Sequence, residues 1–128
     1  KYQDPQSGTW YQVTDQGARE GNYLESSATA LFVYTLAKAI NKGYLGNEYI
    51  EPTKKAFDGM VKTFTRLEED GSYTITNCCA VAGLGGDSKR YRDGSFEYYI
   101  SEPIIENDPK SVGSFILAAI EYEKLTTK

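Results

Sequence analysis

Apolar residues recur at helical spacing in three segments of the chain, and the segments differ in how much of each helix is apolar. In residues 23–40 they form two stripes, so that beyond Ala28 the helix is apolar nearly all round. Residues 109–125 repeat this broad pattern, which is typical of helices buried on every side. Residues 52–64 instead place lysines opposite their apolar side chains, which predicts a surface helix. Pro52 is acceptable there because it falls in the first turn.

Residues with known preferences for helix ends support these boundaries. Asn22 can cap the first helix, and Gly43 can end it. Pro109 fits the first position of the last helix, where its missing N–H costs nothing. Asn107 or Asp108, just before this proline, can supply the N-terminal cap of that helix.

The segments between the helices predict one clear hairpin. The sequence FTRLEEDGSYTIT (64–76) predicts two short strands joined by a turn at Asp70 and Gly71. Within the polar stretch 1–21 we expect a short strand around Trp10, Tyr11 and Val13. Residues 78–99 contain GLGG and RDGS and form a long loop, and loops of this length in compact domains are usually lids or binding loops.

The predicted elements follow the pattern of inner and outer helices in an α/α toroid. Two helices have the broad apolar pattern of buried helices, the amphipathic helix lies between them, and polar loops precede the helix N-termini. We therefore predict a mainly α fold, a partial (α/α)6 toroid with a small β-hairpin. Two inner helices cannot close such a ring, so we expect partner helices to be missing or supplied by another chain. The isolated chain would hide its remaining apolar surface by self-association or by rearranging its ends. It begins at Lys1 without Met, as an excised piece would.

Composition fits one compact domain and narrows the classes of partner. A chain of 128 residues can bury a sizeable core. The net charge is −4 without any Lys/Arg-rich run, which argues against nucleic acid and anionic membranes as partners. No signal peptide or membrane span is expected. The 11 tyrosines are compatible with a cleft for sugars, although most single tyrosines serve ordinary packing.

The sequence contains no His and two adjacent cysteines, Cys78 and Cys79. Neighbouring cysteines rarely form a disulfide, because the link would be strained. Without His, a metal site at these cysteines is not expected, and the Ser-His and Cys-His catalytic systems are excluded. The sequence GLGG (83–86) matches neither glycine-rich phosphate motif, so a tight turn is the simpler interpretation.

Polar and acidic residues gather where the two apolar helices begin. Glu25, Ser26 and Ser27 lie in the first turn of the first helix, where an anionic ligand or an inward carboxylate is favourable, and where capping is the commoner role. Carboxylate pairs can hydrolyse glycosidic bonds, but loop acids mostly cap helices or pair with cations. The acidic residues before the last helix are Glu97, Glu102, Glu106 and Asp108, and the nearby cations are Lys89, Arg90, Arg92 and Lys110.

Long ordered stretches of the sequence resemble a known enzyme family. They are GTWYQVTDQGAREGNYLESSATALFVYTLAKAINKGYL, AGLGG and RDGSFEYYISEPIIENDPKSVGSF. They are similar to the C-terminal part of unsaturated rhamnogalacturonyl hydrolases, glycoside hydrolase family 105, and the resemblance covers essentially the whole chain. It implies that residues 1–128 are the C-terminal segment of an (α/α)6-barrel glycoside hydrolase domain. It also implies that the complete enzyme removes unsaturated galacturonic acid from the non-reducing end of pectin oligosaccharides.

The resemblance implies hydration of the C4–C5 double bond, with an Asp as general acid and no metal or organic cofactor. That Asp and the main substrate-binding residues of the family lie upstream of the matched region, so no catalytic residue is assigned in this chain. Ser111 stands where the family pattern usually has Gly. The residues expected near the sugar pocket are Trp10, Gln12, Glu25 and Tyr98. The alternative is a non-catalytic helical module that binds carbohydrate or serves a structural role.

Overall fold

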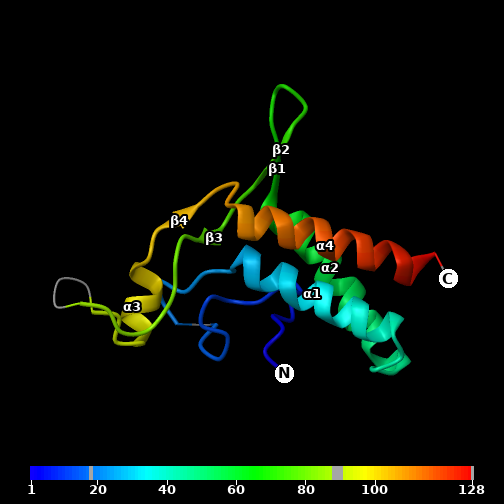
Figure 1. Cartoon of the computed structure of the whole chain (residues 1–128), viewed down its shortest axis with the longest axis horizontal. Helices are drawn as coiled ribbons and strands as arrows, with labels where there is room; N and C mark the ends of the chain where they lie inside the picture. Colours follow the sequence, from blue (N-terminus) through cyan, green and yellow to red (C-terminus); the bar gives the residue numbers. More distant parts are fainter. Residues whose placement is uncertain (18, 88–90, 128) are drawn as a thin grey trace.

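The computed structural model describes residues 1–17, 19–87 and 91–127. In this part of the chain, helices dominate and two small antiparallel sheets of two strands each lie beside them (Figure 1). The predicted mainly α fold with a small β-hairpin is confirmed. The elements are α1 (Ser26–Asn41), η1 (Asn47–Tyr49), α2 (Ile50–Phe64), β1 (Thr65–Leu67), β2 (Tyr73–Ile75), β3 (Cys78–Cys79), α3 (Phe96–Ser101), β4 (Ile104–Ile105) and α4 (Pro109–Thr126).

Helices α1 and α4 pack side by side and run in the same direction (Figure 1). At their N-terminal ends the hydroxyls of Ser26 and Ser111 lie 2.9 Å apart. At their C-terminal ends Asn41 Nδ2 donates to the carbonyl of Glu121 at 2.9 Å. Small buried side chains allow the two backbones to approach closely, and they are Ser26, Ala30 and Ala37 of α1 and Ser111, Ser114 and Ala118 of α4.

Helix α2 is the one-sided surface helix that its pattern predicts. Its apolar side contributes Met60 and Phe64 to the core, and the ring of Phe64 meets that of Phe115 at 6.5 Å. On its opposite side Lys55 and Lys62 are exposed. The core of the described residues therefore lies between α2 and the α1–α4 pair, and it contains Ala30, Val33, Ala56, Met60, Phe64, Ile75, Phe115 and Ala118.

The predicted ends of the helices are largely confirmed. Gly43 follows α1 with a φ of 73°, and its N–H donates to the carbonyl of Ile40. Pro109 opens α4, and the side chain of Asp108 caps it. The predicted cap at Asn22 is wrong, because α1 begins three residues beyond the predicted start at Tyr23. Asn22 instead closes the preceding loop, where its side chain donates to the carbonyls of Val13 and Gln16 at 2.9 and 2.8 Å.

The strand predictions had mixed outcomes. The β1–β2 hairpin is confirmed, with Gly71 at a φ of 84° in its turn. The strand expected at residues 10–13 is reduced to one isolated bridge between Tyr11 and Leu24. The segment 78–99 is not one long loop, because β3 pairs with β4 and α3 occupies its end. These elements are two to six residues long, too short to show a periodic pattern in the sequence.

The two helices predicted to be buried all round are buried on one face only. Their outward faces carry large apolar side chains with exposed fractions between 40 and 55%, which are Leu31 and Phe32 of α1 and Ile116, Leu117 and Ile120 of α4. The apolar surface of each of these helices is therefore wider than the part that the rest of this chain covers. Within the described ranges, no helix combines the length and apolar character that crossing a bilayer requires.

The N-terminal segment crosses α2 at a point where only glycine fits. A Cβ atom added to Gly59 would lie 1.8 Å from the carbonyl oxygen of Ser7. The segment is held there by Gln3, whose side chain donates to the carbonyls of Gly8 and Pro52, both at 2.9 Å. This close approach fixes residues 3–9 on α2 and so orders the chain that leads toward Trp10.

We expect Gly59→Ala to lower the free energy of unfolding by about 1–3 kcal/mol, because the added methyl group pushes the Ser7 backbone away. Gly113→Ala in α4 is the matched control, because no atom lies within 4 Å of its Cβ position. There, alanine should raise stability by roughly 0.5–1 kcal/mol, as in any open helix interior. Urea unfolding followed by circular dichroism measures both, and equal effects would contradict the proposed contact.

Candidate functional site

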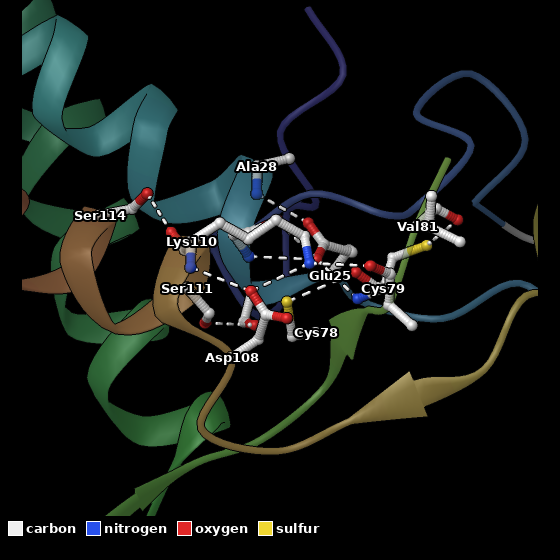
Figure 2. Close-up of polar contacts among 12 residues, drawn as sticks. Glu25, Ala28, Cys78, Cys79, Val81, Asp108, Lys110, Ser111 and Ser114 are labelled. Atoms are coloured by element: carbon white, nitrogen blue, oxygen red, sulfur yellow. Dashed lines mark hydrogen bonds and ion pairs between the residues drawn. The ribbon is translucent and has the colours of Figure 1, made fainter. Parts of the chain in front are cut away.

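The N-terminal ends of α1 and α4 bring the polar residues of the chain together beside β3. Figure 2 shows Glu25 between the first turn of α1 and the backbone of Cys79. Glu25 is 1% exposed. Its Oε1 atom accepts hydrogen bonds from the backbone N–H of Ser27 at 3.2 Å, from the Ser27 hydroxyl at 2.9 Å and from the Cys79 N–H at 3.0 Å. Its Oε2 atom accepts from the Ala28 N–H at 2.7 Å.

These four hydrogen bonds make Glu25 the N-terminal cap of α1 and the link between that helix and β3. A buried carboxylate is stable only when donors of this kind replace its lost hydration. The positive end of the α1 dipole adds to this stabilisation. The predicted site residue Glu25 therefore lies in the interior, with both oxygens engaged by this chain's own donors.

Asp108 and Lys110 form the corresponding arrangement at α4. The Asp108 carboxylate accepts from the Lys110 backbone N–H at 2.9 Å. The Lys110 ammonium lies 3.0 Å from Asp108 Oδ1 and donates to the carbonyl of Ala80 at 3.0 Å. This ammonium and the backbone N–H hold the pKa of the Asp108 carboxyl below its usual range. Lys110 therefore ties the start of α4 to the chain just after β3 (Figure 2).

The two cysteines between these caps are buried free thiols. Burial raises the pKa of the Cys78 thiol, and the nearby Glu25 carboxylate raises it further. Gln12 Nε2 lies 3.2 Å from Cys79 Sγ and donates to it. The structure thus brings two predicted site residues, Gln12 and Glu25, to the same short strand.

The other two predicted site residues lie apart from this pair. The Trp10 carbonyl accepts from the Glu25 N–H at 2.9 Å, but its ring packs on Phe32 along the side of α1, with ring centroids 5.0 Å apart. Tyr98 is in α3, where its hydroxyl accepts from the Gly83 N–H at 3.1 Å. Burial raises the pKa of Tyr98, and a hydrogen bond with Glu102 raises it further.

The acidic residues before α4 mostly pair with cations, as the simpler interpretation of the sequence expects. Glu106 meets Arg66 through two hydrogen bonds of 2.7 and 2.9 Å, so the β1–β2 hairpin is fixed to the loop before α4. Glu97 pairs with Arg19, which also lies over the ring of Phe96. The remaining pairs are Glu102 with Arg92 and Asp108 with Lys110, while the predicted partners Lys89 and Arg90 lie outside the described residues.

Two asparagines help to position the caps: Asn77, which the sequence analysis did not name, and Asn107, which it named as an alternative to Asp108 for the cap itself. Asn77 and Asn107 have φ angles of 57° and 52°, a left-handed conformation that Asn tolerates better than most residues. The Asn77 carbonyl accepts from Ser26 at 3.0 Å. The Asn107 side chain accepts from the Ile75 N–H at 2.8 Å. The sequence signal for these two positions is an asparagine one residue before a helix cap or a short strand.

Among the described residues, Cys, Asp and Glu side chains do not gather in groups of three or more that could hold a metal ion. The backbone N–H donors at the two helix starts are instead satisfied by the carboxylates of Glu25 and Asp108. What the arrangement provides is a rigid platform: two parallel helix N-termini, a short strand between them, and the exposed ammonium of Lys110.

We expect Glu25→Gln to lower the free energy of unfolding by about 1–3 kcal/mol, because an amide nitrogen would face backbone donors that the carboxylate now satisfies. Glu123→Gln, at an exposed position of α4, is the control and should change stability by no more than about 0.5 kcal/mol. Urea unfolding at neutral pH measures both variants. A Glu25→Gln protein as stable as the wild type would show that this carboxylate is free to turn toward a ligand.

The Asp108–Lys110 pair predicts a pH dependence of stability. Because the pKa of Asp108 is lowered on folding from its usual 3.8, its stabilising effect is complete above that value and is lost as the pH falls through the folded value. Asp108→Asn keeps a capping side chain but removes the charge. Wild type should be the more stable at pH 7, and its advantage should shrink once the pH falls below 3.8 and be lost below the folded pKa of Asp108. A gap that is constant with pH in thermal unfolding would contradict the pair.

Comparison with known proteins identifies the family. The sequence model of Glycosyl Hydrolase Family 88 matches residues 1–126. The chain is 38% identical over 120 residues to protein Atu3128 of Agrobacterium fabrum and, equally, to the 24.9 kDa protein in the picA locus of Rhizobium radiobacter. These matches cover 91% of this chain and 52% of each relative. The chain thus spans about half the length of these curated relatives.

Solved structures of family 105 glycoside hydrolases, which are (α/α)6 toroids, are also similar to this chain, so the predicted partial toroid is confirmed. A family 105 glycoside hydrolase of C. acetobutylicum is 48% identical, with a TM-score of 0.92 over 96% of this chain and 34% of its own. A possible family 105 member from Klebsiella pneumoniae is 28% identical, with a TM-score of 0.71 over 98% of this chain and 28% of its own. The resemblance seen in the sequence is therefore confirmed, and the chain belongs to Glycosyl Hydrolase Family 88.

Proposed function

We propose that this chain is part of a toroidal glycoside hydrolase that removes unsaturated galacturonic acid from the non-reducing end of pectin-derived rhamnogalacturonan oligosaccharides. The observation that carries the proposal is the likeness to a solved family 105 hydrolase, with 48% identity and a TM-score of 0.92 over 96% of the chain. The sequence motifs around WYQV, GNYLE and YYISEPI support the same substrate class, because they resemble the unsaturated rhamnogalacturonyl hydrolases.

Within such an enzyme, this chain would supply two inner helices and part of the pocket rim. Both inner helices, α1 and α4, begin at the same end, and β3, β4 and α3 lie at that end (Figure 1). Gln12 and Tyr98 are the predicted sugar-binding residues that belong to loops and elements there. Both carboxylate oxygens of Glu25 accept hydrogen bonds, from Ser27, Ala28 and Cys79. Glu25 would therefore stabilise the conformation of this rim.

The reaction that we propose adds water across the C4–C5 double bond of the unsaturated sugar, after which the ring opens and the aglycone leaves. The general acid that protonates the double bond would come from the part of the toroid that this chain does not contain. The contribution of this chain is positioning, because the acidic groups near the rim are engaged in caps and ion pairs, and these are Glu25, Glu97, Glu102, Glu106 and Asp108. It would therefore fix the rim loops around the sugar and exclude water from the side that it covers.

The purified chain alone should not consume an unsaturated galacturonyl disaccharide, because loss of a general acid typically costs 10²- to 10⁴-fold in rate by itself. A full-length chimera, in which residues 1–126 replace the superimposed part of the C. acetobutylicum enzyme, should consume it. The ultraviolet absorbance of the unsaturated sugar, which disappears with the double bond, measures both reactions.

The unmodified C. acetobutylicum enzyme and a buffer blank serve as controls for this assay. Activity of the isolated chain above the blank would contradict the assignment of the general acid to another segment. A folded chimera that hydrolyses saturated glycosides but leaves the unsaturated disaccharide intact would contradict the proposed substrate.

A further inference from the structure

The thiol of Cys79 makes hydrogen bonds in two directions. The backbone of this residue is fixed, because its N–H donates to the buried carboxylate of Glu25 at 3.0 Å and its strand, β3, pairs with β4. Its Sγ atom donates to the carbonyl of Val81 at 3.3 Å (Figure 2) and accepts from Nε2 of Gln12 at 3.2 Å. Cys79 is 5% exposed, so the interior of the chain holds this geometry.

These two contacts decide which way the amide of Gln12 faces. A thiol has a single proton, and that of Cys79 is directed at the Val81 carbonyl. The sulfur can therefore only accept, so the Gln12 amide turns an N–H toward it. The orientation of a side-chain amide follows from such a network, and here Oε1 of Gln12 lies on the side away from the thiol. Because Gln12 is only half-buried, Oε1 is available to a donor from outside the chain.

The phenol of Tyr23 also lies beside this thiol, but it does not replace Gln12 as the donor to sulfur. The Tyr23 carbonyl accepts from the Gln12 backbone N–H at 2.8 Å, which keeps the two residues together. The Tyr23 hydroxyl is buried and has no hydrogen-bond partner among the described residues. Burial raises the pKa of this phenol, and the neighbouring Cys79 and Glu25 raise it further, so the hydroxyl keeps its proton. The side chain that depends on the Cys79 sulfur for its orientation is therefore Gln12.

We propose that Cys79 is a positioning residue for substrate binding, which fixes the Gln12 amide so that its Oε1 atom accepts a hydrogen bond from a ring hydroxyl of the sugar. The inference rests on the proposed function, which places Gln12 at the sugar. A carbonyl oxygen accepts from hydroxyl groups and repels carboxylates, so Gln12 contacts the hydroxyl side of the uronic acid rather than its carboxylate. Ligand sites use a few fixed polar groups of this kind to set the orientation of the ligand. The thiol acts through Gln12, without touching the sugar.

The first experiment measures variants of the full-length chimera on the unsaturated galacturonyl disaccharide. Cys79→Ala removes both hydrogen bonds of the thiol and should raise KM about 3- to 10-fold with kcat within about 2-fold, because the contact that it weakens is made in ground state and transition state alike. Cys79→Ser keeps a group that donates and accepts, so it should bring KM back to within about 2-fold of wild type. Cys78→Ala is the matched control, because this buried thiol donates to the Cys79 carbonyl and not to Gln12, and it should leave KM unchanged.

A double variant separates positioning from general destabilisation. Gln12→Ala should raise KM by itself, and the further change Cys79→Ala should then alter it by less than about 2-fold, since two residues that act through one contact are not additive. A Cys79→Ala effect that persists in full in the Gln12→Ala background would overturn the proposal. Equal effects of Cys78→Ala and Cys79→Ala on KM would overturn it as well, because the cause would then be the loss of a buried thiol.

A second measurement follows the contact in the 128-residue chain, where no activity is needed. The side-chain amide of Gln12 gives a pair of NH2 signals in proton–nitrogen correlation NMR spectra, identified by their loss in Gln12→Ala. These signals should shift in Cys79→Ala, stay close to their wild-type positions in Cys79→Ser, and remain in place in Cys78→Ala. Gln12 signals that Cys79→Ala leaves in place would overturn the proposal. An inactive chimera together with Gln12 signals that depend on Cys79 would reject the proposed substrate, but not the positioning of Gln12.

Discussion

The carboxylate of Glu25 is the interaction on which the candidate rim depends. It is fully buried, it caps α1, and it holds the backbone of Cys79 in the neighbouring strand. Because an isolated charge is costly inside a protein, this arrangement exists only if all its donors are in place at once. Gln12 reaches the same strand through Cys79 Sγ. The positions of α1, β3 and the N-terminal loop therefore depend on one another.

The long helices could be predicted from the sequence, because 15 or more residues at helical spacing leave little ambiguity. The amphipathic α2, with lysines on one side, and the turn at Asp70 and Gly71 were equally clear. The β3–β4 pair could not be predicted in this way. Each of its strands has two residues, and the partners are separated by 25 or more positions in the chain. Their pairing follows from how the helices place the chain, not from a local pattern.

The candidate site was partly predictable for a related reason. Glu25 and the residues before α4 were identified because polar residues at the start of an apolar helix are rarely accidental. The cap itself was assigned to Asn22, since asparagine is the stronger capping residue in general. In the structure Glu25 is the cap, and its carboxylate also accepts a hydrogen bond from the Cys79 N–H of another segment. Capping preferences read from the local sequence do not include such a contact. Likewise, a broad apolar pattern predicts burial but not which segment covers the helix. Phe32, for example, lies in such a pattern and is 40% exposed in this chain.

The parallel packing of α1 against α4 also has a consequence for the order of folding. Ser26 and Ser111, whose hydroxyls meet, are 85 positions apart, whereas α1 and α2 are neighbours along the chain. Closing a large loop is slower than pairing adjacent helices, so the α1–α2 hairpin should form before α4 docks. Until then the small-residue stripe around Ala30 and Ala37 stays uncovered. During synthesis this stripe stays exposed until α4 has left the ribosome, and a chaperone could bind it in that interval.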